Sequence, residues 1–471
     1  MRDCNHRAIR TQISFLRRQF LQEGDLPFTD VLTPETIAPA LATLGSWRDR
    51  VYTPLVTLWV FLGQVLSADH SCRAAVARLI AHRLSQGLEA CSAKTGAYCQ
   101  ARGRLSEKFF SAVTCLAGRA LDAKNDPQWL WKGRPVYMFD GTVVSMPDTA
   151  ENQAAYPQPY NQRPGLGFPL ARIGAITSLA TGAIIDLGFS RYAGKGQGEV
   201  TLLRRLSHVF SAGDVLLADC LIGNWRCLYE LQQGGVDMVT RLNKALRKAD
   251  FRKGRRLGKD DHLVRWPKPH IREVGRKAQL AMPRYLTVRE VRVSIKQPGF
   301  RTKVMVIVTT LLDPVRYPKQ DLADLYRQRW NNELDLRSIK TTMQMDQLRC
   351  ITPESVRKEV WTHVLAYNLI RTIMAQAAMQ HGIQPRTISF KGALQTLEAF
   401  QPLIDYHGHR GRAFRLHLYQ QLLNSIVLHR VGDRPDRFEP RRRKRRPPLY
   451  GYLRIPRNET KLAMIKGTKN N

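Results

Sequence analysis

The chain has 471 residues and a hydrophobic fraction of 43%, which suits roughly two to four domains with a substantial core. Its 74 Lys and Arg against 39 Asp and Glu give a net charge of +35, which repels itself unless a polyanion balances it. Nucleic acid is therefore the leading partner, and no membrane is expected because neither a convincing basic amphipathic helix nor a lipid anchor is evident.

The first segment, residues 1–128, is predicted to be helical. Apolar residues recur at helical spacing over residues 55–66, 74–84 and 109–121, with polar, basic stretches between them. A helical DNA-reading unit and a plain helical scaffold explain this pattern about equally well. The most apolar run, residues 54–68, is shorter than the roughly 20 residues that a membrane span needs, so it is predicted to be a buried helix.

The opening residues and the cysteines predict a reducing compartment. Residues 1–12 are polar and show no signal peptide. The eight cysteines are scattered and form no Cys-x-x-Cys pair, so a zinc ribbon is not indicated. These features favour reduced thiols and a cytoplasmic protein.

From Pro135 the pattern changes to short apolar strands and intervening helices. Strands are predicted over residues 136–139, 171–179, 182–192, 214–218 and 238–242. Helices over residues 199–210 and 225–233 separate the last three strands. This order of elements predicts an α/β fold.

A basic segment then interrupts the α/β pattern. Residues 241–303 contain 20 basic and 5 acidic residues, and residues 285–294 alternate between apolar and polar side chains. Alternation of this kind is typical of a strand, so we predict a β-rich basic insertion over about residues 243–302. Residues 303–310 return to an apolar core strand.

The segment from Tyr326 to Lys340 reads as one helix with an unusual face. At about 100° per residue, four polar side chains fall within an arc of roughly 60°: Tyr326, Arg329, Glu333 and Lys340. A carboxylate flanked by cations suits a site that holds both a metal ion and phosphates. Because mixed charge on a helix is more often a solvated surface, this interpretation requires acidic partners elsewhere.

The C-terminal part is predicted to be helical over residues 351–428, followed by a basic, Pro-rich tail over residues 429–471. The tail includes six basic residues in a row at 441–446 and is expected to be weakly ordered without a partner. The helical region has apolar stripes that could form a dimer surface or pack in the core, such as Val360, Val364, Leu365 and Leu369.

Two acidic residues, Asp140 and Asp219, each follow an apolar strand. Ligands gather at the carboxyl ends of strands in open α/β sheets, although either residue alone could be a turn or helix cap. Together with Glu333 they supply three carboxylates, which can hold two divalent ions about 3.5–4 Å apart. Mg²⁺ suits an all-carboxylate site that shares ligands with phosphate. No phosphate-binding loop and no His-Glu-x-x-His motif is present.

At these residues the chain resembles the DDE transposases of the insertion sequence 4 family, bacterial relatives of the transposon Tn-five enzyme. Three features support the resemblance: Asp140-Gly-Thr with Met146-Pro-Asp-Thr149, the strand ending Leu217-Ala-Asp219, and the Tyr-x2-Arg-x3-Glu-x6-Lys signature at residues 326–340. It covers about residues 50–450. Cys220 departs from the family, which often has Arg after the second Asp.

The resemblance implies an RNase H-like catalytic core over residues 129–350, containing the β-rich insertion and flanked by the two helical regions. It implies that Asp140, Asp219 and Glu333 are catalytic residues that bind Mg²⁺, with Mn²⁺ able to substitute. The other signature residues, Tyr326, Arg329 and Lys340, would contact DNA phosphates. Trp266 is a candidate for stacking on a flipped base, although it could equally be a core residue of the insertion.

The implied function is cut-and-paste transposition of an insertion sequence, by metal-dependent DNA cleavage and strand transfer. Its partners would be double-stranded DNA, namely terminal inverted repeats and target DNA, bound by a homodimer that forms on the DNA in the bacterial cytoplasm, at the nucleoid. The segment 1–128 would bind the terminal DNA, and 351–428 could dimerise. Two alternatives are an RNase H-like nuclease or resolvase without strand transfer and a catalytically idle DNA-binding derivative, which the intact acidic triad disfavours.

Overall fold

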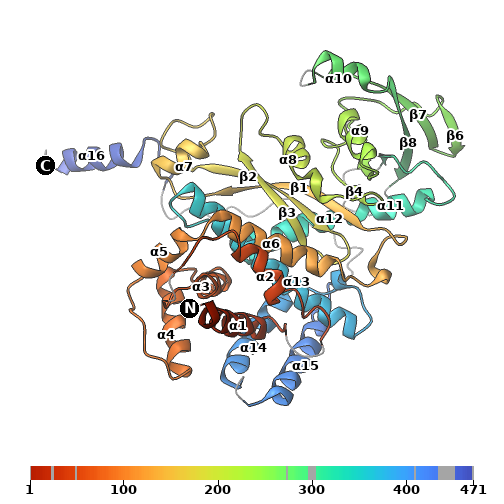
Figure 1. Cartoon of the computed structure of the whole chain (residues 1–471). Coiled ribbons are helices and arrows are strands. Elements are labelled where there is room, and N and C mark those ends of the chain that lie inside the picture. Colours follow the sequence, from red (N-terminus) through yellow and green to blue (C-terminus); the bar gives the residue numbers. More distant parts are fainter. Residues whose placement is uncertain are drawn as a thin grey trace.

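The computed structural model describes residues 2–22, 26–47, 50–271, 274–294, 304–407, 410–432 and 451–468 (Figure 1). The run of basic residues at 441–446, in the tail predicted to be weakly ordered without a partner, lies outside this part of the chain. The described residues form one α/β assembly, which confirms the predicted fold class at that level.

Within the described ranges, a nine-stranded sheet forms the centre of the fold, in the order β3-β2-β1-β4-β5-β9-β8-β7-β6. The strands are β1 Val136–Ser145, β2 Leu170–Ser178, β3 Ile184–Arg191, β4 Val215–Leu217, β5 Asp237–Arg241, β6 Arg255–Gly258, β7 Asp261–Pro267, β8 Tyr285–Ser294 and β9 Val304–Thr309. Strands β1, β4 and β5 run parallel, and all other neighbours pair antiparallel. The strands within the predicted insertion therefore continue the central sheet through β9.

In the described residues, six α-helices precede the sheet: α1 Arg2–Gln19, α2 Pro34–Leu41, α3 Pro54–Leu66, α4 Cys72–Ser85, α5 Gly96–Arg104 and α6 Glu107–Asp122. Their starts follow from local sequence, because Thr53, Ser71 and Ser106 each accept a hydrogen bond from the backbone amide three residues later. Helix α3 is the predicted buried helix, and no helix in the described residues is long and apolar enough to cross a membrane.

Helices also connect and follow the strands. Those between strands are α7 Ala150–Ala155, α8 Glu199–Leu206, α9 Trp225–Gln233 and α10 Arg276–Ala281, and those after β9 are α11 Lys319–Gln328, α12 Trp330–Arg337, α13 Pro353–Gln380, α14 Phe390–His407, α15 Arg412–Leu428 and α16 Arg457–Thr468. In the view of Figure 1, α6 and α13 run below the sheet and α8 lies above it.

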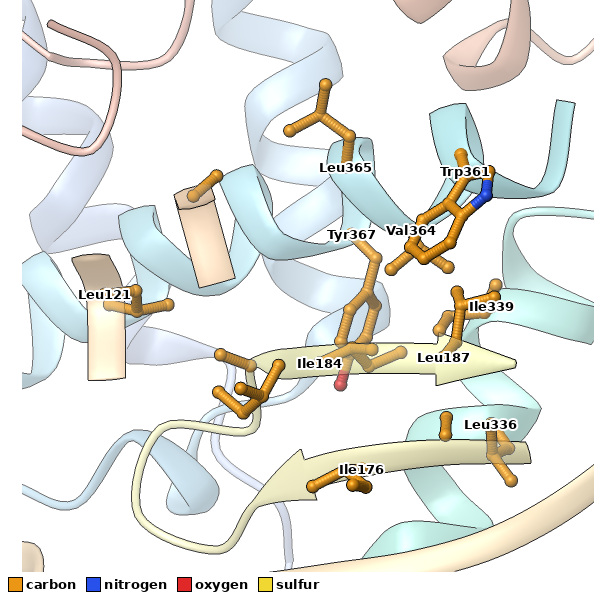
Figure 2. Close-up of a cluster of buried hydrophobic side chains, with 14 of the residues drawn as sticks. Leu121, Ile176, Ile184, Leu187, Leu336, Ile339, Trp361, Val364, Leu365 and Tyr367 are labelled. Atoms are coloured by element: carbon orange, nitrogen blue, oxygen red, sulfur yellow. The ribbon is translucent and has the colours of Figure 1, made fainter. Parts of the chain in front are cut away.

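The long helix α13 lies inside the molecule. Val360, Val364, Leu365 and Leu369 are all buried. In Figure 2 Val364 and Leu365 belong to the same hydrophobic cluster as Ile176 of β2 and Ile184 of β3. Of the two alternatives that the sequence left open for this stripe, the structure therefore supports core packing, because the side chains lie in that cluster and α13 contacts α6 and α3.

The predicted single helix over residues 326–340 is interrupted. Helix α11 ends at Gln328, α12 begins at Trp330, and residues Ser338–Thr342 form a π-helical turn. Arg329 joins the first two segments with helical dihedral angles. The prediction of one regular helix was therefore wrong, and the π turn shifts Lys340 away from the angular position that a regular helix would give it.

Candidate active site

The two predicted aspartates lie at matching positions on neighbouring parallel strands. Met138 of β1 pairs with Leu217 of β4, and this pair ends the ladder between the two strands. Asp140 and Asp219 each follow two residues later. Asp140 does not end its strand as predicted, because β1 continues to Ser145 in its pairing with the antiparallel strand β2. The carboxyl end of β4 nevertheless brings both acids to the same region of the sheet.

Backbone amides fix the orientation of both aspartate side chains. The Gly141 amide donates to Asp140 Oδ1 at 2.8 Å. The amides of Leu221 and Ile222 donate to Asp219 Oδ1 at 2.8 and 3.3 Å. Asp219 is therefore also a turn cap, the structural role that the sequence left open.

Arg329 links the helix to the sheet. Its Nη2 lies 2.7 Å from Glu333 Oε1, and its Nη1 lies 3.8 Å from Asp140 Oδ2. One guanidinium therefore lies between the carboxylates of Asp140 and Glu333. The structure brings these two predicted residues together through a positive charge.

Tyr326 lies on the Asp219 side of this cluster. It is buried, and this burial raises the pKa of its phenol to about 12; the nearby Arg329 and Arg241 act in the opposite direction, and Asp219 raises the pKa further. Arg241 in turn donates to the Cys220 thiol at 3.4 Å. Cys220, the departure from the family pattern, thus has an arginine beside it that comes from strand β5.

The Asp140 carboxyl is costly to ionise in its surroundings. Burial raises its pKa to about 6; the Gly141 hydrogen bond and Arg329 act in the opposite direction, and Glu199 and Glu333 raise it further. A carboxylate whose charge is disfavoured by burial and by neighbouring acids gains most from an added cation. This environment fits a divalent metal ion.

Glu199 is a residue of the cluster that sequence reasoning missed. It begins α8 and pairs with Arg172 of β2 at 2.8 Å. A Cβ atom at Gly141 would lie only 2.6 Å from Glu199 Oε1, so the glycine after Asp140 makes room for this side chain. The sequence signal that could have indicated Glu199 is the glycine-rich loop at residues 194–198, directly before the start of α8.

Neither Lys340 nor Trp266 contacts the three predicted acids in the described part of the chain. Lys340 is half-buried in the π turn, and no hydrogen bond or ion pair within the described ranges joins its ammonium to the three predicted acids. Trp266 is 4% exposed, its Nε1 donates to Glu290 Oε1 at 2.8 Å, and the Arg247 guanidinium lies 4.7 Å from its ring centre. Its ring is packed within the insertion and is not accessible to a base.

The acids form a cluster rather than a closed ligand cage. Among the residues that the structure describes, no three His, Cys, Asp or Glu side chains lie close enough together to hold a metal ion. The guanidinium between Asp140 and Glu333 occupies the place where a cation balances their charges. The site thus combines acids from two neighbouring strands of the sheet and an arginine from a helical segment, an arrangement suited to phosphoryl transfer.

An α/β sheet with such a site defines a class of phosphoryl-transfer enzymes, and the comparisons specify which. Residues 131–369, about half of the chain, match the family model described as Transposase DDE domain, and this range contains Asp140, Asp219 and Glu333. The chain therefore belongs to the DDE transposases, enzymes that act on DNA.

Individual proteins with known names are also similar to this chain. The chain is 29% identical over 460 residues to Transposase InsG for insertion sequence element IS4 of Escherichia coli (strain K12), covering 92% of this chain and 95% of that one. The resemblance to insertion sequence 4 transposases is thereby confirmed. A solved structure, the piggyBac transposase synaptic complex with hairpin DNA, is 9% identical with a TM-score of 0.42, covering 88% of this chain and 85% of that chain.

Proposed function

We propose that this DNA transposase moves an insertion sequence by a cut-and-paste reaction, cleaving DNA at the ends of the element and joining them to target DNA. The main supporting observation is the convergence of Asp140 and Asp219 at matching positions beyond the β1–β4 ladder, with Arg329 linking Asp140 to Glu333. Both steps of such a reaction are phosphoryl transfers, which one cluster of acids can serve in turn.

The catalytic core is proposed to be RNase H-like. Strands β3, β2 and β1 form an antiparallel meander, and β4 and β5 follow in parallel on the other side of β1. The core is assigned to residues 129–350 with the insertion at about 243–302. The segment 1–128 is assigned to terminal DNA, and a dimerising role stays with 351–428, now without the buried stripe of α13.

Asp140, Asp219 and Glu333 are proposed to hold divalent metal, with Mg²⁺ as the natural ion and Mn²⁺ as a substitute. When bound, the metal would activate the attacking oxygen and stabilise the leaving one. The protein's own contribution is orientation. Backbone amides fix both aspartates, and because burial raises the pKa of Asp140 to about 6, a nearby cation would favour its ionised form.

Arg329, Tyr326 and Lys340 are proposed to bind DNA phosphates beside the acids. Arg329 can present two N–H donors to a phosphate, whereas Lys340 would act as a point charge. The Tyr326 phenol is protonated at neutral pH, since burial only raises its pKa further, to about 12, and it can therefore donate a hydrogen bond. The base-stacking role is not assigned to Trp266.

The proposed partners are terminal inverted repeats and target DNA, bound by a homodimer that forms on the DNA at the nucleoid. The net charge of +35 supports binding to a polyanion and disfavours association of free subunits.

The decisive experiment incubates the protein with DNA that ends in the inverted repeats flanking its gene, with Mg²⁺, Mn²⁺ or EDTA. Cleaved ends joined to target DNA support transposition. Cleavage without joining would instead indicate a nuclease, and binding without cleavage an idle derivative. Glu333→Gln and Asp219→Ala should abolish both products while DNA binding in Ca²⁺ persists. Asp324→Asn, an exposed acid on α11, is the matched control and should remain active.

A further inference from the structure

A second carboxylate on the helix of Glu333 faces the interior of the protein. Asp335 follows Glu333 by two residues on α12, which at about 100° per residue places the two side chains on nearly opposite faces. Glu333 is half-buried beside Arg329, whereas Asp335 is only 1% exposed. The two acids of one short helix therefore have different surroundings.

Two arginines from outside the helix, the buried Arg371 and the partly buried Arg386, bind Asp335. Arg371 of α13 donates from Nη2 to Asp335 Oδ1, and Arg386 donates from Nη1 to Oδ2 at 2.6 Å. Each carboxylate oxygen thus has its own guanidinium. Since Arg386 lies in the short 3-10 turn Pro385–Thr387, the two donors reach Asp335 from different elements.

Both arginines are themselves anchored. Arg386 donates from Nη2 to the Ser178 carbonyl at 2.6 Å and from Nε to the Leu179 carbonyl at 2.9 Å, at the end of β2. Arg371 donates from Nε to the Tyr367 hydroxyl at 2.7 Å. Gly182 has a φ of +81°, and a Cβ there would lie 2.8 Å from Arg371 Nε. The loop between β2 and β3 is therefore shaped around this arginine.

Apolar packing alone would hold α12 less specifically. The helix has eight residues, and its inner side continues through Leu336 into Ile339 of the π turn. Figure 2 shows these two side chains in the hydrophobic cluster with Ile176, Leu187 and Tyr367. Contacts of this kind are not directional, so they tolerate small rotations of a short helix.

The buried charges are not a general source of stability. Desolvation of one carboxylate and two guanidiniums offsets much of their attraction, and apolar residues of similar volume often stabilise a core as well or better. Fixed geometry is what the ionic arrangement adds. The two oxygens of Asp335 set both the rotation and the depth of α12 against α13 and β2.

We propose that Asp335, held between Arg371 and Arg386, is the positioning residue that aims Glu333 at Asp140. The inference rests on the proposed metal-binding role of Glu333. Glu333 is on a helix and Asp140 on the sheet, so their relative placement depends on how that helix is seated. This clamp, formed by Asp335, Arg371 and Arg386, connects α12 to the end of β2, and β2 pairs with β1 at Asp140.

The test measures Mn²⁺ binding to the full-length protein by electron paramagnetic resonance. Asp335→Glu keeps the charge but lengthens the clamp by one methylene, and Arg386→Lys keeps the charge but loses the paired carbonyl contacts. We expect each to weaken Mn²⁺ binding about tenfold or more, as loss of a supporting contact around metal ligands does. DNA affinity in Ca²⁺ should change little, because the clamp is buried.

A matched control separates positioning from general loosening. Asn368 lies on the same helix as Arg371. Its side-chain oxygen accepts a hydrogen bond from the Ile184 backbone N–H, and its side-chain nitrogen donates to the Ile184 carbonyl, both at 2.9 Å. Asn368→Ala should destabilise the protein but leave Mn²⁺ affinity nearly unchanged. Thermal unfolding of each variant shows which of them are folded, and Arg386→Lys provides the result if Asp335→Glu does not fold.

Three results would overturn the proposal. Asp335→Glu and Arg386→Lys could bind Mn²⁺ as the parent does, or Asn368→Ala could weaken Mn²⁺ binding as much as they do. In either case the proposed metal-binding role of Glu333 would still hold, provided that the parent binds Mn²⁺ and the Glu333→Gln variant does not. If the parent itself shows no Mn²⁺ binding that depends on Glu333, the metal-binding role fails together with the positioning role.

Discussion

Replacing Asp140 by Asn should stabilise the metal-free protein at neutral pH, although it removes a proposed metal ligand. Burial raises the pKa of Asp140 from 3.8 to about 6, so between these values the folded protein binds more protons than the unfolded chain. Stability from this group is therefore full below about pH 4 and is lost as the pH rises through 6. The Asp140→Asn side chain has no charge to bury and keeps an oxygen for the Gly141 amide.

The size of the effect follows from the shift. About two pKa units at 1.36 kcal/mol each correspond to ~3 kcal/mol at pH 7.5. The Asp140 side chain is 22% exposed, so solvent screening removes only part of this value. At pH 4.5 the same relation gives a destabilisation by the Asp140 carboxyl of only ~1 kcal/mol. The advantage of the variant should therefore grow by about 2 kcal/mol between these two pH values.

Urea denaturation in EDTA at pH 4.5 and 7.5, followed by tryptophan fluorescence, measures this difference. Asp324→Asn changes an exposed acid that is paired with Arg327 and should show a pH-independent difference within about 0.5 kcal/mol. An Asp140→Asn protein that is less stable than the parent at pH 7.5, or whose advantage does not depend on pH, would refute the reasoning.

Three further predictions concern DNA. Lys340→Ala should slow strand transfer more than it weakens DNA binding, because many other cations remain; an unchanged rate in single-turnover assays would mark Lys340 as a surface residue. Affinity for terminal DNA should fall steeply between 50 and 200 mM salt in gel-shift titrations, about a thousandfold if six or more phosphates are contacted, and a shallow dependence would contradict binding by the basic surfaces. Light scattering should show a monomer alone and a two-to-two complex with terminal DNA; concerted cutting by a complex with one protein chain would contradict the dimer.

The acids near the sheet were predictable because their placement depends on local patterns. Short apolar runs before Asp140 and Asp219 mark adjacent core strands, and such strands in an α/β order bring their ends together. Glu199 could not be found this way. Its approach to Asp140 depends on the tertiary path of α8 and on the missing side chain of Gly141, 58 positions earlier in the sequence.

The helix illustrates a second limit. Helical periodicity predicted that four side chains lie on one face of a regular α-helix: Tyr326, Arg329, Glu333 and Lys340. The break at Arg329 and the π turn change that helical geometry. Similarly, an apolar stripe that suggested a dimer surface is core, because periodicity cannot say which protein surface a stripe contacts. The Trp266 ring was ambiguous for the same reason until its contacts with Glu290 and Arg247 were known.

The pairing of acids with arginines bears on the proposed role of these carboxylates in a reaction on a polyanion. Glu333 and Asp140 share Arg329, and Glu199 pairs with Arg172, so the three carboxylates near β1 have two guanidiniums among them. The local charge is close to balanced within a chain of net charge +35. A DNA phosphate that approaches the acids therefore meets little net repulsion, and a divalent ion adds positive charge where burial makes the Asp140 carboxylate most in need of it. Removing Arg329 should then harm the approach of the phosphate even where the three acids are intact.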